Sequence, residues 1–211
     1  MRRTFGRAAL PVACAAALVA GTPAMASAKP STVTPIGPVT FTNTVNVLFQ
    51  NITTGSVVTC SSSVLSGATQ VPPAPPFRVN TATFESPANP LSACSHPSMI
   101  IVDITSNGLP WSFNAASYAS GVTTGTLGGV RFTFQDSSGC DATIGGPGAT
   151  PGAVGATYTN VTGRLKYTTA SANLVVKTAD ADCDPDIINV GDSIRLSGEY
   201  QASPKISITL P

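Results

Sequence analysis

The chain has 211 residues, of which only 10% are charged, and its 11 basic and 10 acidic side chains give a net charge of +1. With no basic surplus to neutralise a phosphate backbone, nucleic-acid binding is disfavoured. A chain of this length can bury a sizeable core in one domain. Because charges are so few, solubility must come from serine, threonine and asparagine, and threonine suits the exposed faces of antiparallel sheets.

The first 28 residues have the parts of an export signal. Three arginines within the first seven residues precede an alanine-rich run, and Ala26-Ser27-Ala28 supplies the small residues that a signal peptidase needs. We predict a signal peptide over residues 1–28, removed after export by the Sec or twin-arginine route. The mature chain would carry eight basic and ten acidic side chains, a net charge of −2. No run approaches the roughly 18 apolar residues of a transmembrane segment, so we expect a secreted or cell-wall-associated protein.

The mature chain is predicted to be all-β. Residues 29–38 contain three prolines and are expected to form an extended arm outside the fold, and residues 39–211 a single domain. No window has a helical period. The fold class is a single antiparallel β-sandwich or partly closed β-barrel of about ten strands. Strand-like runs occur, in chain order, at 39–41, 45–50, 56–60, 78–85, 99–104, around Trp111, 122–127, 130–135, 156–160, 164–168, 173–178, 193–200 and 205–210.

Three of these runs carry further predictions. Residues 99–104 are the most continuously apolar run of the mature chain and indicate a central strand covered on both faces. Residues 130–135 alternate strictly and indicate a half-buried antiparallel strand, separated from the preceding run by Gly128-Gly129. Trp111, the only tryptophan, and Phe113 would share one strand face, which predicts a buried structural role for Trp111.

Four cysteines remain in the mature chain, Cys60, Cys94, Cys140 and Cys183, and an even number in an exported chain implies two disulfides. None lies in a Cys-x-x-Cys pair, which disfavours a zinc site. Four cysteines allow three pairings, and loop entropy separates them by only about 1 kcal/mol. We predict the sequential pairing, Cys60 with Cys94 and Cys140 with Cys183, because it closes two moderate loops that do not overlap.

Six short stretches form a familiar pattern: VTCSSS at 58–63, GLPWSFN at 108–114, GVTTGT at 121–126, YTN at 158–160, INVGD at 188–192 and SGEY at 197–200. In these stretches the chain resembles a group of exported all-β proteins of actinobacteria. The resemblance covers most of the mature chain and implies export and β architecture, but no activity. Pro72-Pro73 and the acidic run 180–186 depart from the pattern.

Candidate catalytic residues are few. The only histidine, His96, lies in a proline-flanked loop, where we expect it to be solvated, and no Gly-x-Ser-x-Gly elbow accompanies it. A glycosidase needs two carboxylates, and the two glutamates, Glu85 and Glu199, lie at strand ends. Asp103 interrupts an apolar strand, where we expect it to bond backbone amides or Arg131, or to lie at an edge. We therefore predict no enzyme; two carboxyls converging in one cleft would favour a hydrolase instead.

The strongest local anomaly is the acidic run containing Asp180, Asp182, Asp184 and Asp186. Proline at its sixth position and glycine at its twelfth exclude an EF-hand. We hypothesise that these aspartates bind Ca²⁺ weakly, with Asp192 completing the shell; the alternative is a solvated acidic turn. We expect no other cofactor.

These observations favour an exported, non-enzymatic β-domain that acts outside the cell or in the envelope as a binding or structural module. Its ligand is unknown, and we expect a monomer. The alternatives are a secreted hydrolase whose site is not recognisable in the sequence, and a ligand-binding or pore-forming β-barrel.

Overall fold

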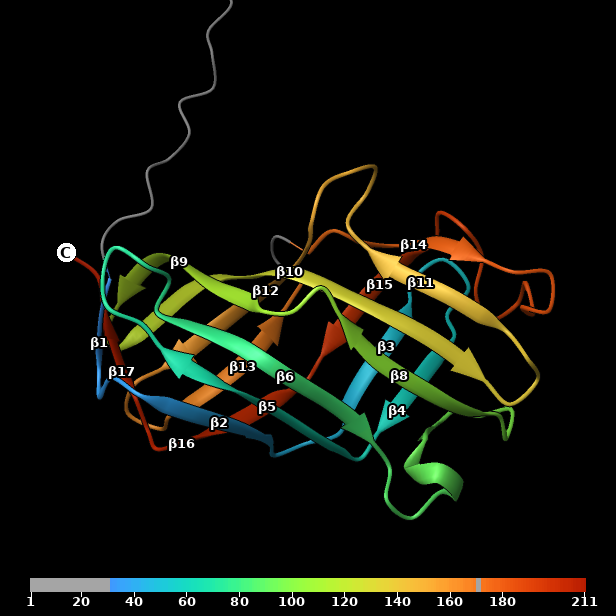
Figure 1. Cartoon of the computed structure of the whole chain (residues 1–211), viewed down its shortest axis with the longest axis horizontal. Coiled ribbons are helices and arrows are strands. Elements are labelled where there is room, and N and C mark those ends of the chain that lie inside the picture. The colour runs from blue at the N-terminus through green and yellow to red at the C-terminus, as the bar shows by residue number, and fades with distance from the viewer. Residues whose placement is uncertain (1–30, 170–171) are drawn as a thin grey trace, which may run out of the picture.

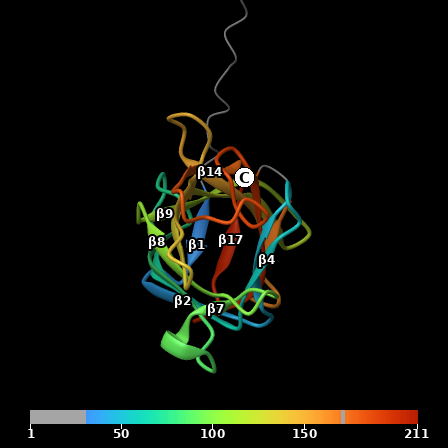
Figure 2. The same cartoon turned by 90° about the vertical axis from the view of Figure 1, so that its right-hand side faces the viewer.

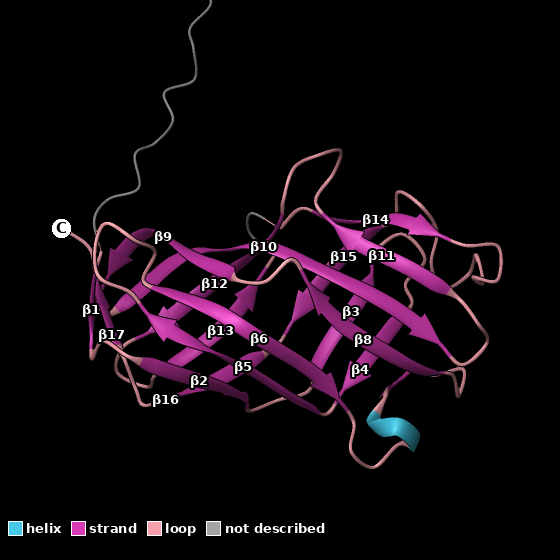
Figure 3. Ribbon diagram, viewed as in Figure 1, coloured by secondary structure: helices cyan, strands magenta, loops and turns pink. Residues whose placement is uncertain are grey.

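The computed structural model describes residues 31–169 and 172–211, which form strands and one short 3-10 helix, η1 (Pro90–Ser92) (Figures 1 and 3). The predicted signal peptide lies outside the described residues. The strands are β1 (Thr32–Thr34), β2 (Pro38–Asn43), β3 (Val47–Asn51), β4 (Val57–Cys60), β5 (Ser62–Thr69), β6 (Phe77–Glu85), β7 (Cys94–Ser95), β8 (Ile101–Asn107), β9 (Trp111–Ala119), β10 (Val122–Asp136), β11 (Asp141–Gly145), β12 (Gly152–Thr159), β13 (Arg164–Thr168), β14 (Leu174–Ala179), β15 (Ser193–Ser197), β16 (Glu199–Ser203) and β17 (Ser207–Thr209).

Eight of these strands form a closed antiparallel barrel. The pairing runs from β10 through β12, β13, β16, β2, β5, β6 and β9 and returns to β10. The all-β prediction is confirmed, and of the two predicted architectures the structure has the barrel, closed rather than partly closed. Closure removes the free edges that an open sheet would expose.

The remaining long strands extend the barrel along its axis. The 15-residue β10 pairs with β9 and β12 over its first part and with β8 and β11 over its second. Beyond that point, pairing continues through β14, β15, β3, β4 and β7 back to β8, so a second circuit of strands shares β10 with the barrel. The result is the elongated body in Figure 1.

The prediction that Gly128-Gly129 separates two strands is wrong. The strand continues through a register shift between Gly128 and Val130, and Gly129 has φ +87°, a conformation open to glycine at little cost. The pair therefore forms a bulge within one strand and marks the change of partners from the barrel to the second circuit.

Aromatic side chains fill the interior. Phe41, Phe77 and Phe113 pack in series, with ring centroids 4.8 and 4.9 Å apart. Farther along the axis, Trp111 and Phe132 meet edge to face at 5.3 Å. Trp111 is fully buried, as predicted, and its indole Nε1 donates a hydrogen bond to the Asn107 carbonyl at 2.9 Å.

The prediction that residues 29–38 form an arm outside the fold is wrong for the part that the structure describes. Within it, β1 pairs with β17, and Val33 is only 2% exposed. The Thr69 hydroxyl donates to the Pro35 carbonyl and accepts from the Gly37 amide, which fixes the segment that follows. Seen along the long axis, β1 and β17 lie within the outline of the barrel, so the segment covers one end of the core (Figure 2).

Both predicted disulfides are present. Cys60 and Cys94 join β4 to β7, and Cys140 and Cys183 join the start of β11 to the acidic loop. The first bond fixes a segment with little regular pairing of its own: β7 has two residues and pairs with β4 only between Thr59 and Ser95.

The estimate of about ten strands is too low because several strands lie in serine- and glycine-rich sequence. In β5, a Cβ at Gly67 would lie 1.7 Å from the Arg78 carbonyl oxygen, so the close approach of β6 requires glycine there. Residues 99–104 also differ from the prediction. β8 alternates buried and exposed residues, and its outer face is open to solvent.

Candidate functional site

A row of threonines crosses the outer face of the second circuit. The strand registers place Thr133 of β10 opposite Thr105 of β8 and Thr143 of β11, and Thr143 opposite Thr178 of β14. Neighbouring strands lie about 4.8 Å apart, so these four side chains form a nearly straight array of hydroxyls. The Thr143 and Thr178 hydroxyl oxygens are 2.6 Å apart.

Arg131 lies at one end of this face, two residues before Thr133 on the same side of β10. Its aliphatic stem passes beside two glycines: a Cβ at Gly108 would lie 3.2 Å from its Cδ, and a Cβ at Gly145 would lie 3.6 Å from its Cγ. The side chain is exposed. The only ion pair among the described residues joins Arg164 to Glu199. None of the described carboxylates therefore pairs with Arg131.

A bulge in β14 brings Lys177 to the same end of the outer face as Arg131. Thr143 pairs with Thr178 and Ile144 pairs with Val176, which leaves Lys177 as the extra residue between them. A bulge turns the side chain of its extra residue, and both Lys177 and Thr178 therefore face outward. The Lys177 ammonium donates to the Gly148 carbonyl in the loop above.

The loop between β11 and β12 borders the same hollow as these two cations. At its base, a Cβ at Gly146 would lie 2.4 Å from the Pro151 carbonyl oxygen, so the two ends of the loop meet only because residue 146 is glycine. Beneath the loop is a hollow of about 420 Å³, which we call the β10–β11–β14 groove. Its polar lining includes Asn107, Arg131, Thr143, Gly148, Thr150 and Lys177.

Carboxylates gather at the opposite end of the threonine row. Asp103 and Asp141 flank Gln135 in the register, and the Gln135 amide donates to Asp141 at 2.8 Å. Asp103 is exposed on the outer face beside Gln135, and its partner among the described residues is the Thr105 hydroxyl at 3.3 Å rather than the predicted backbone amides or Arg131. This face therefore runs from cations through hydroxyls to carboxylates.

Two of the three carboxylates considered for catalysis line one hollow. Glu85 and Asp103 both border a space of about 210 Å³, whereas Glu199 lies elsewhere and pairs with Arg164. Both Glu85 and Asp103 are exposed. Two carboxyls in one hollow are the arrangement that would favour a hydrolase. Their exposure points the other way, because a glycosidase acid is usually kept protonated by burial in an apolar pocket.

His96 is half-buried and contacts a serine, contrary to the expectation of a solvated side chain. Its Nε2 is 3.0 Å from Ser56 Oγ, and its Nδ1 accepts the Ser98 amide at 3.2 Å. Which of the Nε2 and Ser56 Oγ atoms donates depends on the tautomer of the ring. A nucleophilic serine also needs a third group that orients the base, and here Nδ1 accepts a backbone amide rather than donating to a carboxylate.

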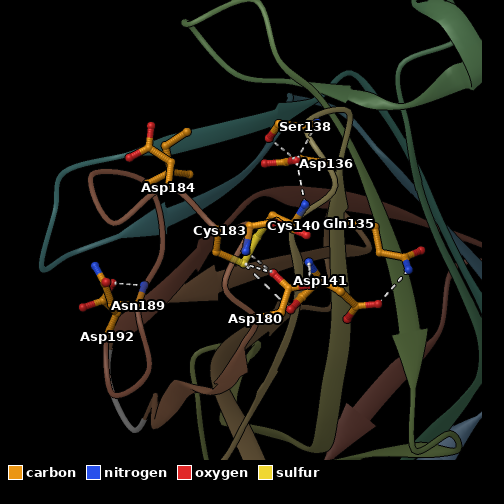
Figure 4. The surroundings of a disulfide bond; sticks show 12 residues. Gln135, Asp136, Ser138, Cys140, Asp141, Asp180, Cys183, Asp184, Asn189 and Asp192 are labelled. Atoms are coloured by element: carbon orange, nitrogen blue, oxygen red, sulfur yellow. Dashed lines mark hydrogen bonds between the residues drawn. A yellow bond between two sulfur atoms is a disulfide. The ribbon is translucent and has the colours of Figure 1, made fainter.

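The acidic aspartates bond mostly to backbone near them. Asp180 accepts the amides of Asp141 and Asp182, and Asp184 accepts the amide of Asp186. Figure 4 shows Asp180 beside the disulfide and Asp184 apart from it. In the described residues, the one cluster of three potential ligands is Asp180 with the two cysteines of that disulfide, whose sulfurs are bonded to each other. Calcium binding by these aspartates would thus require the loop to rearrange, and it stays a prediction.

Asp192 has a structural environment that differs from the predicted role as a calcium ligand. It is 5% exposed, and one carboxylate oxygen accepts from the Asn51 amide and from the Asn189 backbone, each at 2.7 Å. Asn51 also donates to the Ile187 carbonyl. This buried network anchors the end of the acidic loop to β3.

Three buried tyrosines have raised pKa values. Burial raises the pKa of Tyr158 and of Tyr200 to about 12, and it raises that of Tyr167 well above the ordinary value. The Tyr158 hydroxyl donates to the Ile206 carbonyl, and the Tyr200 hydroxyl contacts Ser63 at 3.0 Å. The Tyr167 hydroxyl lies near that of Tyr200, which adds to the effect of burial in raising its pKa, but it makes no hydrogen bond of good geometry among the described residues. All three lie in the core and away from the groove.

The chain matches no protein-family model, and comparisons with curated proteins and with solved structures find no match either. Among the described residues, no helix is long and apolar enough to cross a membrane. The fold and the site define a disulfide-bonded β-barrel with a cation-lined groove on its outer wall, and function must be inferred from that geometry.

Sequence reasoning missed the groove. From the sequence, Arg131 was considered only as a partner for Asp103, and Lys177 was considered only as part of the predicted strand 173–178. The sequence contained one signal for the groove, the glycine-rich segment 145–152 that connects β11 to β12. The cations themselves become neighbours only through strand register and a bulge.

Proposed function

We propose that this protein is an exported, non-enzymatic binding module of the extracellular space or cell envelope, and that it holds its ligand in the β10–β11–β14 groove. The two disulfides support a role outside the cell, since such bonds persist in oxidising compartments. The ligand site lies on the outer wall because aromatic side chains occupy the interior.

One observation carries the proposal: side chains from four strands and the β11–β12 loop converge on one hollow. Among the described residues the Arg131 guanidinium there has no hydrogen-bond or ion-pair partner, and the Lys177 ammonium has one, the Gly148 carbonyl. The hollow's volume of about 420 Å³ falls in the range typical of small-ligand sites. The exposure of Glu85 and Asp103 supports a binding function over hydrolysis. A role as a single-chain module fits the closed barrel, which leaves little open sheet edge for assembly.

Blocking the groove tests this function. Thr143→Trp places an indole on its floor, and Thr157→Trp places the same group on the outer face of β12, away from the groove. A panel of neutral and acidic monosaccharides and of short envelope glycans would be titrated against both variants and the wild type by calorimetry. We expect wild type and Thr157→Trp to bind the same members of the panel and Thr143→Trp to bind none. Equal binding by Thr143→Trp would refute the groove as the site.

A further inference from the structure

We infer that the β10–β11–β14 groove recognises an oxyanion, a carboxylate, sulfate or phosphate group carried on a small hydroxylated ligand. This inference rests on the proposed function and adds the chemical class of the ligand. It starts from charge: Arg131 and Lys177 both line the groove, and the only ion pair among the described residues involves neither.

Neighbouring glycines fix the position of Arg131, and a bulge in β14 fixes that of Lys177. The stem of Arg131 lies against Gly108, where a Cβ would crowd its Cδ at 3.2 Å, and beside Gly145, where a Cβ would contact its Cγ at 3.6 Å. Lys177 is the bulged residue of β14, and its ammonium is held to the Gly148 carbonyl at the groove's roof. An ammonium has three donors, so two remain for a ligand, and a guanidinium offers a planar pair of donors that matches an oxyanion.

The rest of the lining fits the hydroxylated body of such a ligand. Thr143 and Thr150 supply hydroxyls, and Asn107 supplies an amide whose Nδ2 already donates to Thr133 at 2.6 Å, leaving its oxygen to accept. No carboxylate lines the groove, whereas Asp103 and Asp141 lie two rows away on the same face. An anion is therefore attracted at one end of the face and repelled at the other, which orients it.

Substitutions that remove one positive charge, measured with ligands of known charge, test the inference. Glucuronate and glucose 6-phosphate carry the oxyanion, and glucose serves as the neutral probe of similar size. We expect the two anions to bind at least tenfold more tightly than glucose, and Arg131→Gln and Lys177→Gln each to weaken anion binding at least tenfold. The control is Arg78→Gln, because Arg78 is exposed on β6 outside the groove, and this variant should bind with unchanged affinity.

Raising NaCl from 0.05 to 0.5 M should weaken anion binding, because salt screens exposed cations.

The outcomes separate the oxyanion inference from the groove itself. If Thr143→Trp abolishes binding but Arg131→Gln and Lys177→Gln bind as wild type does, the groove stands and oxyanion recognition is wrong. If Thr143→Trp binds normally, both are wrong. Preference for glucuronate over glucose 6-phosphate assigns a carboxylate, and the reverse preference assigns a phosphate. Equal affinity for glucose and both anions would overturn the inference, and circular dichroism of each variant confirms that it is folded.

Discussion

At the scale of single residues, the core contains side chains whose polar atoms are hydrogen-bonded and two, Thr123 and Tyr167, whose hydroxyls have no partner among the described residues. Trp111 combines full burial with an indole hydrogen bond, whereas Tyr167 is 4% exposed and its hydroxyl lacks a partner among the described residues. Trp111 and Tyr167 therefore respond to truncation in opposite directions.

Trp111→Ala should lower the free energy of unfolding by about 3–5 kcal/mol, because it removes a large buried side chain and leaves a cavity. Urea denaturation followed by circular dichroism measures the change. Leu91→Ala is the matched control, since Leu91 is 94% exposed and its truncation removes little buried surface. Unchanged stability in Trp111→Ala would contradict a structural role.

Tyr167→Phe should raise the free energy of unfolding by about 1 kcal/mol, because a buried hydroxyl without a partner carries a desolvation cost. Tyr200→Phe should lower it by about 1 kcal/mol, since that hydroxyl contacts Ser63. Thermal and urea denaturation of the pair make the comparison. A loss of stability in Tyr167→Phe as large as that in Tyr200→Phe would show that the hydroxyl has a partner.

Some residue roles were predictable from sequence and others were not. Burial of Trp111 follows from a local pattern, the alternation with Phe113, and the pairing of Cys60 with Cys94 was favoured by sequence spacing. The nearness of Arg131 and Lys177 depends on β11 lying between their strands and on a one-residue bulge, and no local pattern encodes either.

At the scale of elements, two bulges decide what faces the solvent. The bulge at Gly129 lets β10 change partners without ending, and the bulge at Lys177 turns a cation outward. Alternation predicted the half-buried second part of β10 correctly. The continuous apolar run at β8 wrongly suggested burial on both faces. A strand of the second circuit with one solvent face still tolerates Ile101 on the same side as Asp103.

The acidic loop provides a prediction about an element. If its aspartates bind Ca²⁺, millimolar calcium should raise the melting temperature, and Asp182→Asn with Asp184→Asn should abolish the rise. Asp103→Asn, on the outer face of β8, is the control and should keep it. Scanning calorimetry with calcium and with chelator makes the measurement. A melting curve indifferent to both would end the calcium hypothesis and leave a solvated acidic turn.

At the scale of the whole molecule, burial in the core keeps the hydroxyls of Tyr158, Tyr167 and Tyr200 protonated. Their folded pKa values lie above the ordinary value of 10, reaching about 12 for Tyr158 and Tyr200. Between pH 10 and 12 the unfolded chain loses these protons while the folded chain keeps them. Their contribution to stability is therefore complete below pH 10 and is lost as pH rises toward 12.

Alkaline unfolding should show this loss. Two units of pKa correspond to about 2.7 kcal/mol, so each of Tyr158 and Tyr200 contributes on the order of 2–3 kcal/mol to the fall by pH 12. Urea titrations at pH 8, 10, 11 and 12, with short exposure to preserve the disulfides, measure the free energy of unfolding. A free energy of unfolding that stays constant from pH 8 to pH 12 would mean that the tyrosines are not buried as described.

The central claim is that the outer-wall groove, and not the interior, receives the ligand. Backbone amide spectra of the ¹⁵N-labelled chain titrated with glucuronate test it most directly, because they report every contacted residue at once. We predict saturable shifts at Gly145, Gly146, Gly148 and Thr150, with no change at Gly37, Gly55 and Gly121, which lie outside the groove. Shifts centred on another surface, or none at any concentration that binds, would contradict the claim.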